Sequence, residues 1–175
     1  YLLEGPLAAL DAIEAITDQP NTNVVGYCLG GTLLAALLAY LETTGEASRV
    51  SSGTFLTSMI DFSDPGGLGV FIDDEQVESL EQKMAKDGYL DGSDMATTFN
   101  MLRSNDLIRS FFINNYLMGD ELPVFDLLYW NSDSTRMPAR MHSEYLRTMY
   151  LENRFKDPGG MTLAGVPIDI SSVKT

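Results

Sequence analysis

The stretch Asn23-Val24-Val25-Gly26-Tyr27-Cys28-Leu29-Gly30-Gly31-Thr32 decides the fold. Its first half is short and apolar, as in a fully buried strand, and the residues from Leu29 to Leu41 carry no charge, as in a helix buried on nearly every face. Ser51–Ile60, further along, is rich in residues that favour strands. Strand, helix and strand with short connections predict a βαβ unit and therefore a parallel sheet with a right-handed crossover.

Cys28 stands where the predicted strand meets the predicted helix, in the pattern Gly26-Tyr27-Cys28-Leu29-Gly30. This is the G-x-nucleophile-x-G pattern of a nucleophile elbow, with cysteine as the nucleophile. The residues two before and two after such a turn crowd the strand and the helix, so we expect glycine to be required at both Gly26 and Gly30. The backbone N–H of Leu29 is the expected oxyanion donor, and the helix N-terminus favours a thiolate. The alternative is a small cysteine packed beneath a sheet.

A cysteine nucleophile needs a general base, and His142 is the only histidine in the sequence. It lies in the charged helical pattern Ala139–Phe155, so we interpret it as a surface histidine and expect the catalytic base beyond Thr175. Asp61 and Asp64 follow a predicted strand, where a triad acid would stand. The sequence Asp64-Pro65-Gly66-Gly67 is typical of a turn, and we prefer that interpretation for both aspartates.

The rest of the sequence is mainly helical. Apolar periodicity predicts helices, the last four with no strand between them, over Glu4–Ile16, Asp73–Lys86, Ser93–Arg103 (N-cap Ser93 or Asp94), Asp106–Met118 and Ala139–Phe155. The last predicted helix and the residues just before it carry a series of arginines: Arg136, Arg140, Arg147 and Arg154. These either bind an anionic substrate or form a solvated face paired with Glu144 and Glu152, and we prefer the second interpretation. Bulky residues that either line an acyl pocket or simply pack the insertion are Phe125, Tyr129, Trp130, Met137 and Met141.

Composition narrows the classes of protein. Of 175 residues, 45% are apolar and 21% are charged, which is typical of a soluble globular domain, and no apolar run is long enough to cross a bilayer. A net charge of −14 argues against nucleic acid or an anionic membrane as partner. No metal-ligand spacing, phosphate loop or dinucleotide fingerprint occurs, so we expect neither metal nor cofactor. The sequence opens at Tyr1 without methionine, and we expect it to be an internal piece of a longer protein.

Five segments in order resemble polyhydroxyalkanoate synthases of the class I type, over essentially the whole chain. They are Tyr1-Leu2-Leu3-Glu4-Gly5-Pro6, Asn23 to Thr32, Leu56 to Gly67, Phe125-Asp126-Leu127-Leu128-Tyr129-Trp130-Asn131, and Tyr145 to Asn153. One departure is Arg109, where an aromatic residue is expected; the charge puts the local lid packing or a dimer contact in doubt.

The resemblance implies an α/β-hydrolase fold in three parts. Residues 1–72 would be a partial core with the nucleophile elbow, 73–137 a helical cap or lid, and 138–175 a helix that returns toward the core. It also implies an acyltransferase that polymerises (R)-3-hydroxyacyl-CoA, typically 3-hydroxybutyryl-CoA, into a polyester, with Cys28 carrying the growing chain as a thioester. The catalytic Asp and His of the family would lie outside this chain. The implied setting is a cytoplasmic homodimer on polyester granules.

Two other classes of function stay open on the sequence alone. One is a cysteine α/β-hydrolase that acts as a thioesterase or lactone hydrolase. The other is a non-catalytic, granule-associated domain with an inert cysteine. Whichever holds, we expect residues 1–175 alone to be poorly soluble and inactive.

Overall fold

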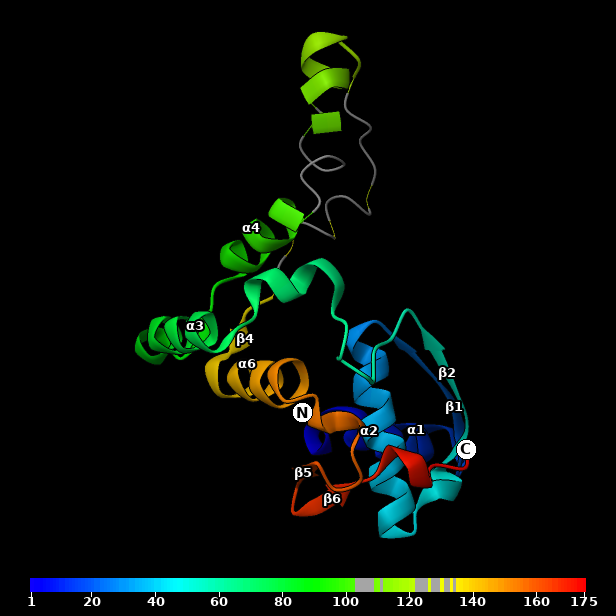
Figure 1. Cartoon of the computed structure of the whole chain (residues 1–175). Helices are drawn as coiled ribbons and strands as arrows, with labels where there is room; N and C mark the ends of the chain where they lie inside the picture. The colour runs from blue at the N-terminus through cyan, green and yellow to red at the C-terminus, as the bar shows by residue number, and fades with distance from the viewer. Residues whose placement is uncertain (103–108, 111, 122–125, 127–129, 131–132, 134) are drawn as a thin grey trace. The chain divides into compact units, whose positions relative to one another are not determined.

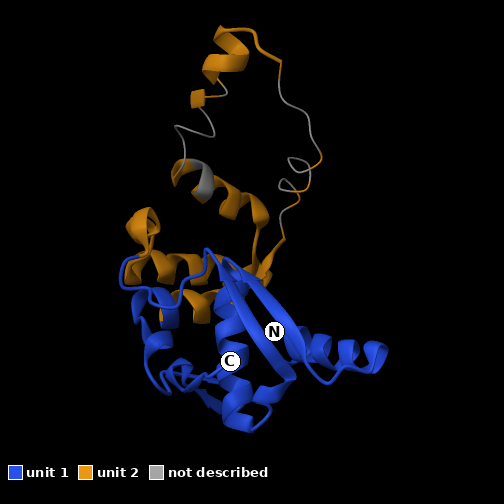
Figure 2. Ribbon diagram, turned by 90° about the vertical axis from the view of Figure 1, so that its right-hand side faces the viewer, with its two compact units in different colours: residues 1–64, 148–175 blue, residues 65–147 orange. Residues whose placement is uncertain are grey.

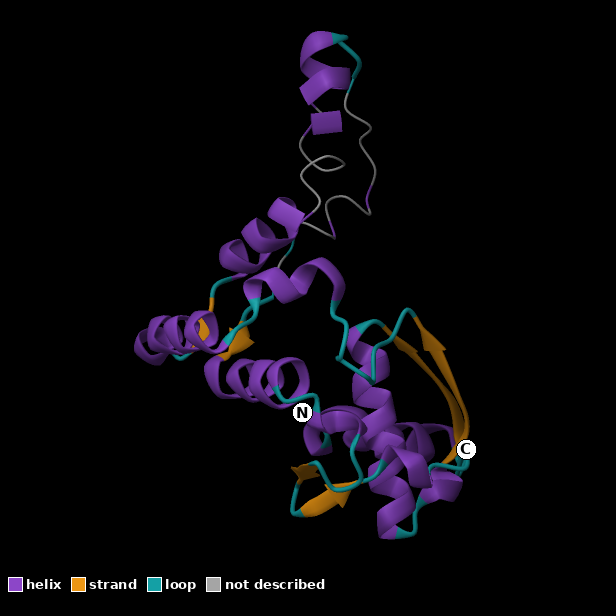
Figure 3. Cartoon of the chain, in the orientation of Figure 1, coloured by secondary structure: helices purple, strands orange, loops and turns teal. Residues whose placement is uncertain are grey.

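The computed structural model describes residues 1–102, 109, 110, 112–121, 126, 130, 133 and 135–175. The chain divides into two compact units, of which unit 1 comprises Tyr1–Asp64 with Thr148–Thr175 and unit 2 comprises Pro65–Arg147 (Figure 2). Helices dominate the described residues, and the strands are few and mostly short (Figure 3). The candidate nucleophile belongs to unit 1.

A βαβ unit forms the centre of unit 1, as the sequence predicts. Strand β1 (Thr22–Tyr27), helix α2 (Leu29–Thr44) and strand β2 (Val50–Leu56) follow one another, and β1 pairs with β2 in parallel (Figure 1). Gly45 ends α2 in the left-handed conformation, with φ of 79°. The strand predicted over Ser51–Ile60 ends early, at Leu56, because Thr57 turns the chain with a positive φ.

The core of unit 1 lies around α2. The buried side chains that pack together there are Leu2, Leu10, Leu34, Leu37, Leu38, Leu41 and Val50. The prediction of a helix buried on nearly every face is confirmed for most of its length, whereas the prediction of a fully buried strand is wrong. Val25 and Tyr27 of β1 are 64% and 69% exposed. Among the described residues β1 has β2 as its partner strand, so much of its side-chain surface stays uncovered.

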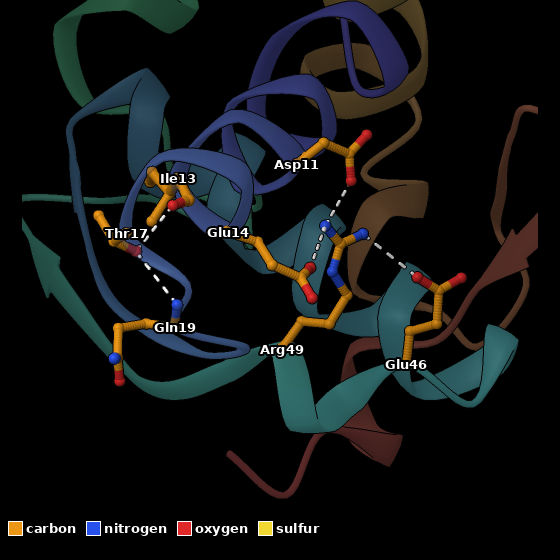
Figure 4. Close-up of polar contacts among 7 residues, drawn as sticks. All are labelled: Asp11, Ile13, Glu14, Thr17, Gln19, Glu46 and Arg49. Carbon is orange, nitrogen blue, oxygen red and sulfur yellow. Dashed lines mark hydrogen bonds and ion pairs between the residues drawn. The ribbon is translucent and has the colours of Figure 1, made fainter.

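The N-terminal helix is fastened to the turn before β2 by one arginine. A π-helical turn, η1 (Leu3–Leu7), leads into α1 (Ala8–Thr17), in agreement with the predicted helix. Arg49, in the 3-10 turn η2 (Ala47–Arg49), donates to Asp11 of α1 at 2.5 Å and to Glu46 at 3.3 Å (Figure 4). The hydrogen bond to Asp11, followed by the charges of both acids, raises the pKa of Arg49.

The C-terminal part of unit 1 packs on α2. It contains the 3-10 turn η7 (Arg154–Lys156), the antiparallel strands β5 (Met161–Leu163) and β6 (Val166–Ile168), and the 3-10 turn η8 (Ile170–Ser172). Both β6 and η8 contact α2. Residues 148–175 therefore form part of the core of unit 1.

The described residues of unit 2 form helices and one pair of short strands. Its elements are η3 (Gly66–Phe71), α3 (Asp74–Asp87), β3 (Tyr89–Leu90), α4 (Gly92–Leu102), η5 (Phe112–Leu117), β4 (Met137–Pro138) and α6 (Ala139–Glu144), which η6 (Tyr145–Leu151) continues across the unit boundary. Strands β3 and β4 pair in antiparallel fashion. The expectation of helices with no strand between them is thus wrong; two residues per strand are too few to leave a sequence signal.

Three helix boundaries in this region differ from the prediction. Helix α4 begins at Gly92, because the carboxylate of Asp91 accepts the backbone N–H of Ser93. Asp91 is therefore the N-cap, in place of the predicted Ser93 or Asp94. The last predicted helix stops at Leu151 as η6, and Asn153 follows in the left-handed conformation. Of the predicted helix Asp106–Met118, residues 106–108 and 111 lie outside the described residues, and η5 covers part of the rest.

Candidate active site

Cys28 occupies the sharp turn between β1 and α2. Its backbone has φ of 51° and ψ of −123°, it is the residue before the helix, and its side chain is exposed and free of any disulfide. A non-glycine residue adopts such a conformation only where its surroundings impose it. An exposed side chain on a strained strand-to-helix turn is the geometry that a nucleophile elbow requires.

The glycines around Cys28 are not equivalent. A Cβ on Gly26 would lie 2.5 Å from Cα of Gly31 and 2.9 Å from O of Gly30, so glycine is required there, as predicted. At Gly30, by contrast, no described atom other than those of the adjoining residues and the backbone of its own helix turn lies within 4 Å of the corresponding position. The close contact falls instead on Gly31, where a Cβ would overlap the Ser58 side chain. The predicted crowding at Gly30 is therefore wrong by one residue.

The first turn of α2 follows directly on Cys28. The hydrogen bonds of the helix begin with Gly31 and Thr32, whose N–H groups donate to the Cys28 carbonyl at 2.9 and 3.4 Å. The N–H of Leu29 precedes them and has no acceptor within the helix, as expected for an N-terminal position. Leu29 thus remains the candidate oxyanion donor, and the helix dipole adds a positive end at the same place.

Thr32 and Ser58 also belong to this site, although the sequence pattern does not single them out. The Thr32 hydroxyl donates to the Met59 carbonyl at 2.7 Å across 27 residues of sequence, and the Thr32 side chain is buried. The Ser58 hydroxyl lies within reach of the Leu56 and Gly26 carbonyls, at 3.1 and 3.4 Å. Only the fold brings these groups together, so no periodicity or spacing could have indicated them.

Asp61 is hydrogen-bonded within its own turn and to Asn153. Its carboxylate accepts from its own loop, through the Ser63 N–H at 3.0 Å, and from Asn153 at 2.8 Å. The Asn153 hydrogen bond, followed by those of Ser63 and Lys156, holds the pKa of Asp61 well below its usual range. The Asn153 amide oxygen in turn accepts the Phe62 N–H at 2.8 Å. These contacts are the ones that the turn interpretation of Asp61 predicts, and the assignment of the catalytic acid stays a prediction.

His142 is not a surface histidine. It lies in α6 of unit 2 with an exposed fraction of 4%, and its Nδ1 has no hydrogen-bond partner among the described residues. Burial lowers its pKa. The surface interpretation is wrong because the charges of neighbouring residues made the helix resemble a solvated face, whereas α6 packs against α3 and β3.

The arginine series divides among different acidic partners. Arg147 makes a bidentate contact with Glu81 at 2.7 and 2.6 Å, an acid that the predicted solvated face did not include. Arg154 pairs with Glu152, one of the two acids that it did include, at 3.4 Å. Arg136 lies over the ring of Tyr89 at 4.6 Å.

Of the bulky residues considered for an acyl pocket, Phe125 and Tyr129 lie outside the described residues, and Trp130 is 71% exposed.

The described part of the chain contains neither a cluster of metal-ligating side chains nor a helix that could span a membrane. No group of three or more His, Cys, Asp or Glu side chains is arranged there to hold a metal ion. No helix there has both the length and the apolar character that crossing a bilayer demands.

The fold and the elbow define the class of protein. Residues 7–158 match the family model described as the alpha/beta hydrolase fold. The chain belongs to this family, as expected from the sequence.

Within that family, the chain is similar to polyester polymerases. It is 52% identical to "Poly(3-hydroxyalkanoate) polymerase subunit PhaC" of Rhizobium meliloti and 49% identical to "Poly(3-hydroxyalkanoate) polymerase" of Methylorubrum extorquens, each over 99% of this chain and 28% of the relative. The corresponding polymerase subunit of Cupriavidus necator is 39% identical over 99% of this chain and 30% of its own length. The chain thus spans less than a third of these relatives, and the resemblance found in the sequence is confirmed.

Proposed function

We propose that the protein containing this chain is an acyltransferase that polymerises (R)-3-hydroxyacyl-CoA thioesters into polyhydroxyalkanoate, with Cys28 as its nucleophile. The observation that carries the proposal is the position of Cys28, exposed on a strained turn at the N-terminus of α2. Identity of 39–52% to proteins named poly(3-hydroxyalkanoate) polymerases supports the choice of reaction within the α/β-hydrolase family.

The proposed chemistry consists of two acyl transfers. In the first, the Cys28 thiolate attacks the thioester carbonyl, the carbon–sulfur bond to CoA breaks, and CoA leaves as its thiol after taking up a proton. In the second, a hydroxyl group attacks the carbonyl of the acyl–Cys28 thioester, an ester forms, and the cysteine sulfur is released. Exchange of one thioester for another is nearly balanced, which suits a residue that must both accept and pass on the chain.

The backbone around Cys28 stabilises the charge that develops. The N–H of Leu29 donates to the oxyanion formed at each attack, and the N-terminus of α2 favours the thiolate before it. Removal of the hydroxyl proton needs a base. The proposal assigns the catalytic histidine and its acid to parts of the protein outside this chain, so residues 1–175 alone should show no turnover.

The test is Cys28→Ala in the complete protein, with wild type beside it. With (R)-3-hydroxybutyryl-CoA as substrate, wild type should release CoA and form insoluble polymer, and Cys28→Ala should lose at least about 10³-fold in CoA release while keeping its circular dichroism spectrum. CoA release retained in the folded variant would remove Cys28 from the mechanism. Free hydroxy acid in place of polymer would select a thioesterase, and slow alkylation of Cys28 in the folded wild type would favour a non-catalytic domain.

The setting of the enzyme forms part of the same proposal. A polymerase whose product is an insoluble polyester would act at the surface of a cytoplasmic granule, and the resemblance to class I synthases suggests a homodimer. Sedimentation of the protein with polyester granules, and its mass in solution by light scattering, test these two statements.

A further inference from the structure

Strands β1 and β2 end at residues that pair with each other, and the chain turns after both. Tyr27 and Leu56 are the last paired residues of β1 and β2. The next residue on each strand, Cys28 and Thr57, has a positive φ, of 51° and 47° respectively. Neither residue is glycine, so each conformation costs free energy and needs contacts that hold it. The turn after β2 is therefore placed to support the turn after β1.

Thr32 joins these two turns. Its backbone N–H donates to the Cys28 carbonyl at 3.4 Å, and its hydroxyl donates to the Met59 carbonyl at 2.7 Å. The side chain is 2% exposed, so loss of the hydroxyl would leave the Met59 carbonyl without this donor in a site that water does not readily reach.

Ser58 also contacts this junction. Its hydroxyl lies 3.4 Å from the Gly26 carbonyl, and its side chain sits where Gly31 lacks a Cβ. In addition, the N–H of Cys28 donates to the Leu56 carbonyl at 2.9 Å, which extends the strand pairing by one residue. The elbow is thus tied to β2 and its following turn by backbone and side-chain hydrogen bonds together.

We propose that Thr32 is a positioning residue for Cys28, and that Ser58 assists it. The Thr32 hydroxyl fixes the first turn of α2 against the turn after β2, and this keeps the Cys28 sulfur and the Leu29 N–H in the arrangement that acyl transfer requires. The inference rests on the proposed function, because the reaction in question is transfer through Cys28. It assigns a role to a hydroxyl that touches neither substrate nor sulfur.

The experiment compares three variants of the complete protein. Thr32→Val keeps the shape of the side chain and removes the hydroxyl, and Thr32→Ser keeps the hydroxyl. Thr43→Val is the matched control, because Thr43 lies on the same helix and its hydroxyl donates to the Ala39 carbonyl at 2.9 Å, away from the elbow. The measurements are kcat and KM for CoA release, and the rate at which iodoacetamide alkylates Cys28, followed by mass spectrometry of the peptide that carries it.

For Thr32→Val we expect kcat to fall about tenfold, because the variant loses one buried hydrogen bond that holds the reacting groups in position. We expect KM to stay within about twofold, since Thr32 is buried and a substrate at the surface would not reach it. Alkylation of Cys28 should slow in parallel, Thr32→Ser should regain most of both rates, and Thr43→Val should match wild type.

Several outcomes would overturn the inference. A folded Thr32→Val protein with unchanged kcat and alkylation would do so, as would a Thr32→Ser variant no better than Thr32→Val. If Thr32→Val fails to fold, Ser58→Ala decides the matter, with an expected fall in kcat of about threefold and an unchanged value as the contrary result. If wild type releases no CoA at all, the proposed function fails, while the alkylation rates still decide whether Thr32 positions Cys28.

Discussion

The glycines of the elbow allow one prediction to be worked through from the structure. Gly26→Ala introduces a Cβ only 2.5 Å from Cα of Gly31 and 2.9 Å from its N. These neighbours are backbone atoms of the first turn of α2, so the clash can be relieved only by moving the helix away from β1. Gly30→Ala introduces a Cβ that, apart from the adjoining residues and the backbone of its own helix turn, has no described atom within 4 Å.

The two substitutions should therefore change stability in opposite directions. Overpacking costs about 1–3 kcal/mol, and we expect Gly26→Ala at the upper end, near ~3 kcal/mol, because backbone must move. Gly30 lies in the first turn of α2, where alanine is favoured over glycine by at most about 1 kcal/mol, the value for a helix interior. The two variants should differ by up to roughly 4 kcal/mol in the free energy of unfolding. A displaced elbow also lowers kcat, by roughly 10²-fold for a misplacement near 1 Å.

The assay combines urea unfolding, followed by circular dichroism, with CoA release by the complete protein. Gly31→Ala is the third member of the series, and it should resemble Gly26→Ala because its Cβ would lie 2.5 Å from Cβ of Ser58. The double variant with Ser58→Gly should recover part of that loss. If Gly30→Ala proves as damaging as Gly26→Ala, the space beside Gly30 is filled in the folded protein and the reasoning fails.

Two further predictions concern acid sensitivity in unit 2. The hydrogen bond from Arg147, with a second from Ser143, lowers the pKa of Glu81 from 4.5 to about 2, so the stability it adds is present above pH 4.5 and is lost as pH falls toward 2. Glu81→Gln should remove this part of the pH dependence of the urea midpoint between pH 5 and 2.5, and an unchanged profile would contradict the assignment. Burial lowers the pKa of His142 below 6.5, so the unfolded chain takes up the proton first and stability falls as pH drops below 6.5. His142→Phe should flatten the midpoint between pH 7 and 5, and a slope equal to that of wild type would refute this.

Local sequence information is sufficient to predict the centre of the fold. An apolar strand, a cysteine between glycines and a helix without charge are features of consecutive residues, and together they predict β1, the elbow and α2. The same reasoning places the parallel partner β2 but extends it four residues too far, since Thr57 has strand-favouring chemistry and nothing local reveals its positive φ.

The features that the sequence did not predict depend on contacts between residues far apart in the chain. His142 has charged neighbours along its helix, and only its packing within unit 2 shows that it is buried. The crowding at Gly31 comes from Ser58, and the link between Asp61 and Asn153 spans 92 residues. No pattern within a window of ten or fifteen residues contains these relationships.

The turn at Cys28 depends both on local sequence and on contacts with distant residues. The five residues of the pattern supply a thiol, a free N–H and one glycine without which the turn cannot close. They do not supply what keeps Cys28 at a φ of 51°, because the hydrogen bonds that do so come from Leu56 and from Thr32 with its acceptor Met59. A cysteine in the same five-residue pattern without those partners would relax to an ordinary backbone conformation, and its sulfur and oxyanion donor would no longer be arranged for acyl transfer. The catalytic role proposed for the motif would therefore depend on residues that lie outside it.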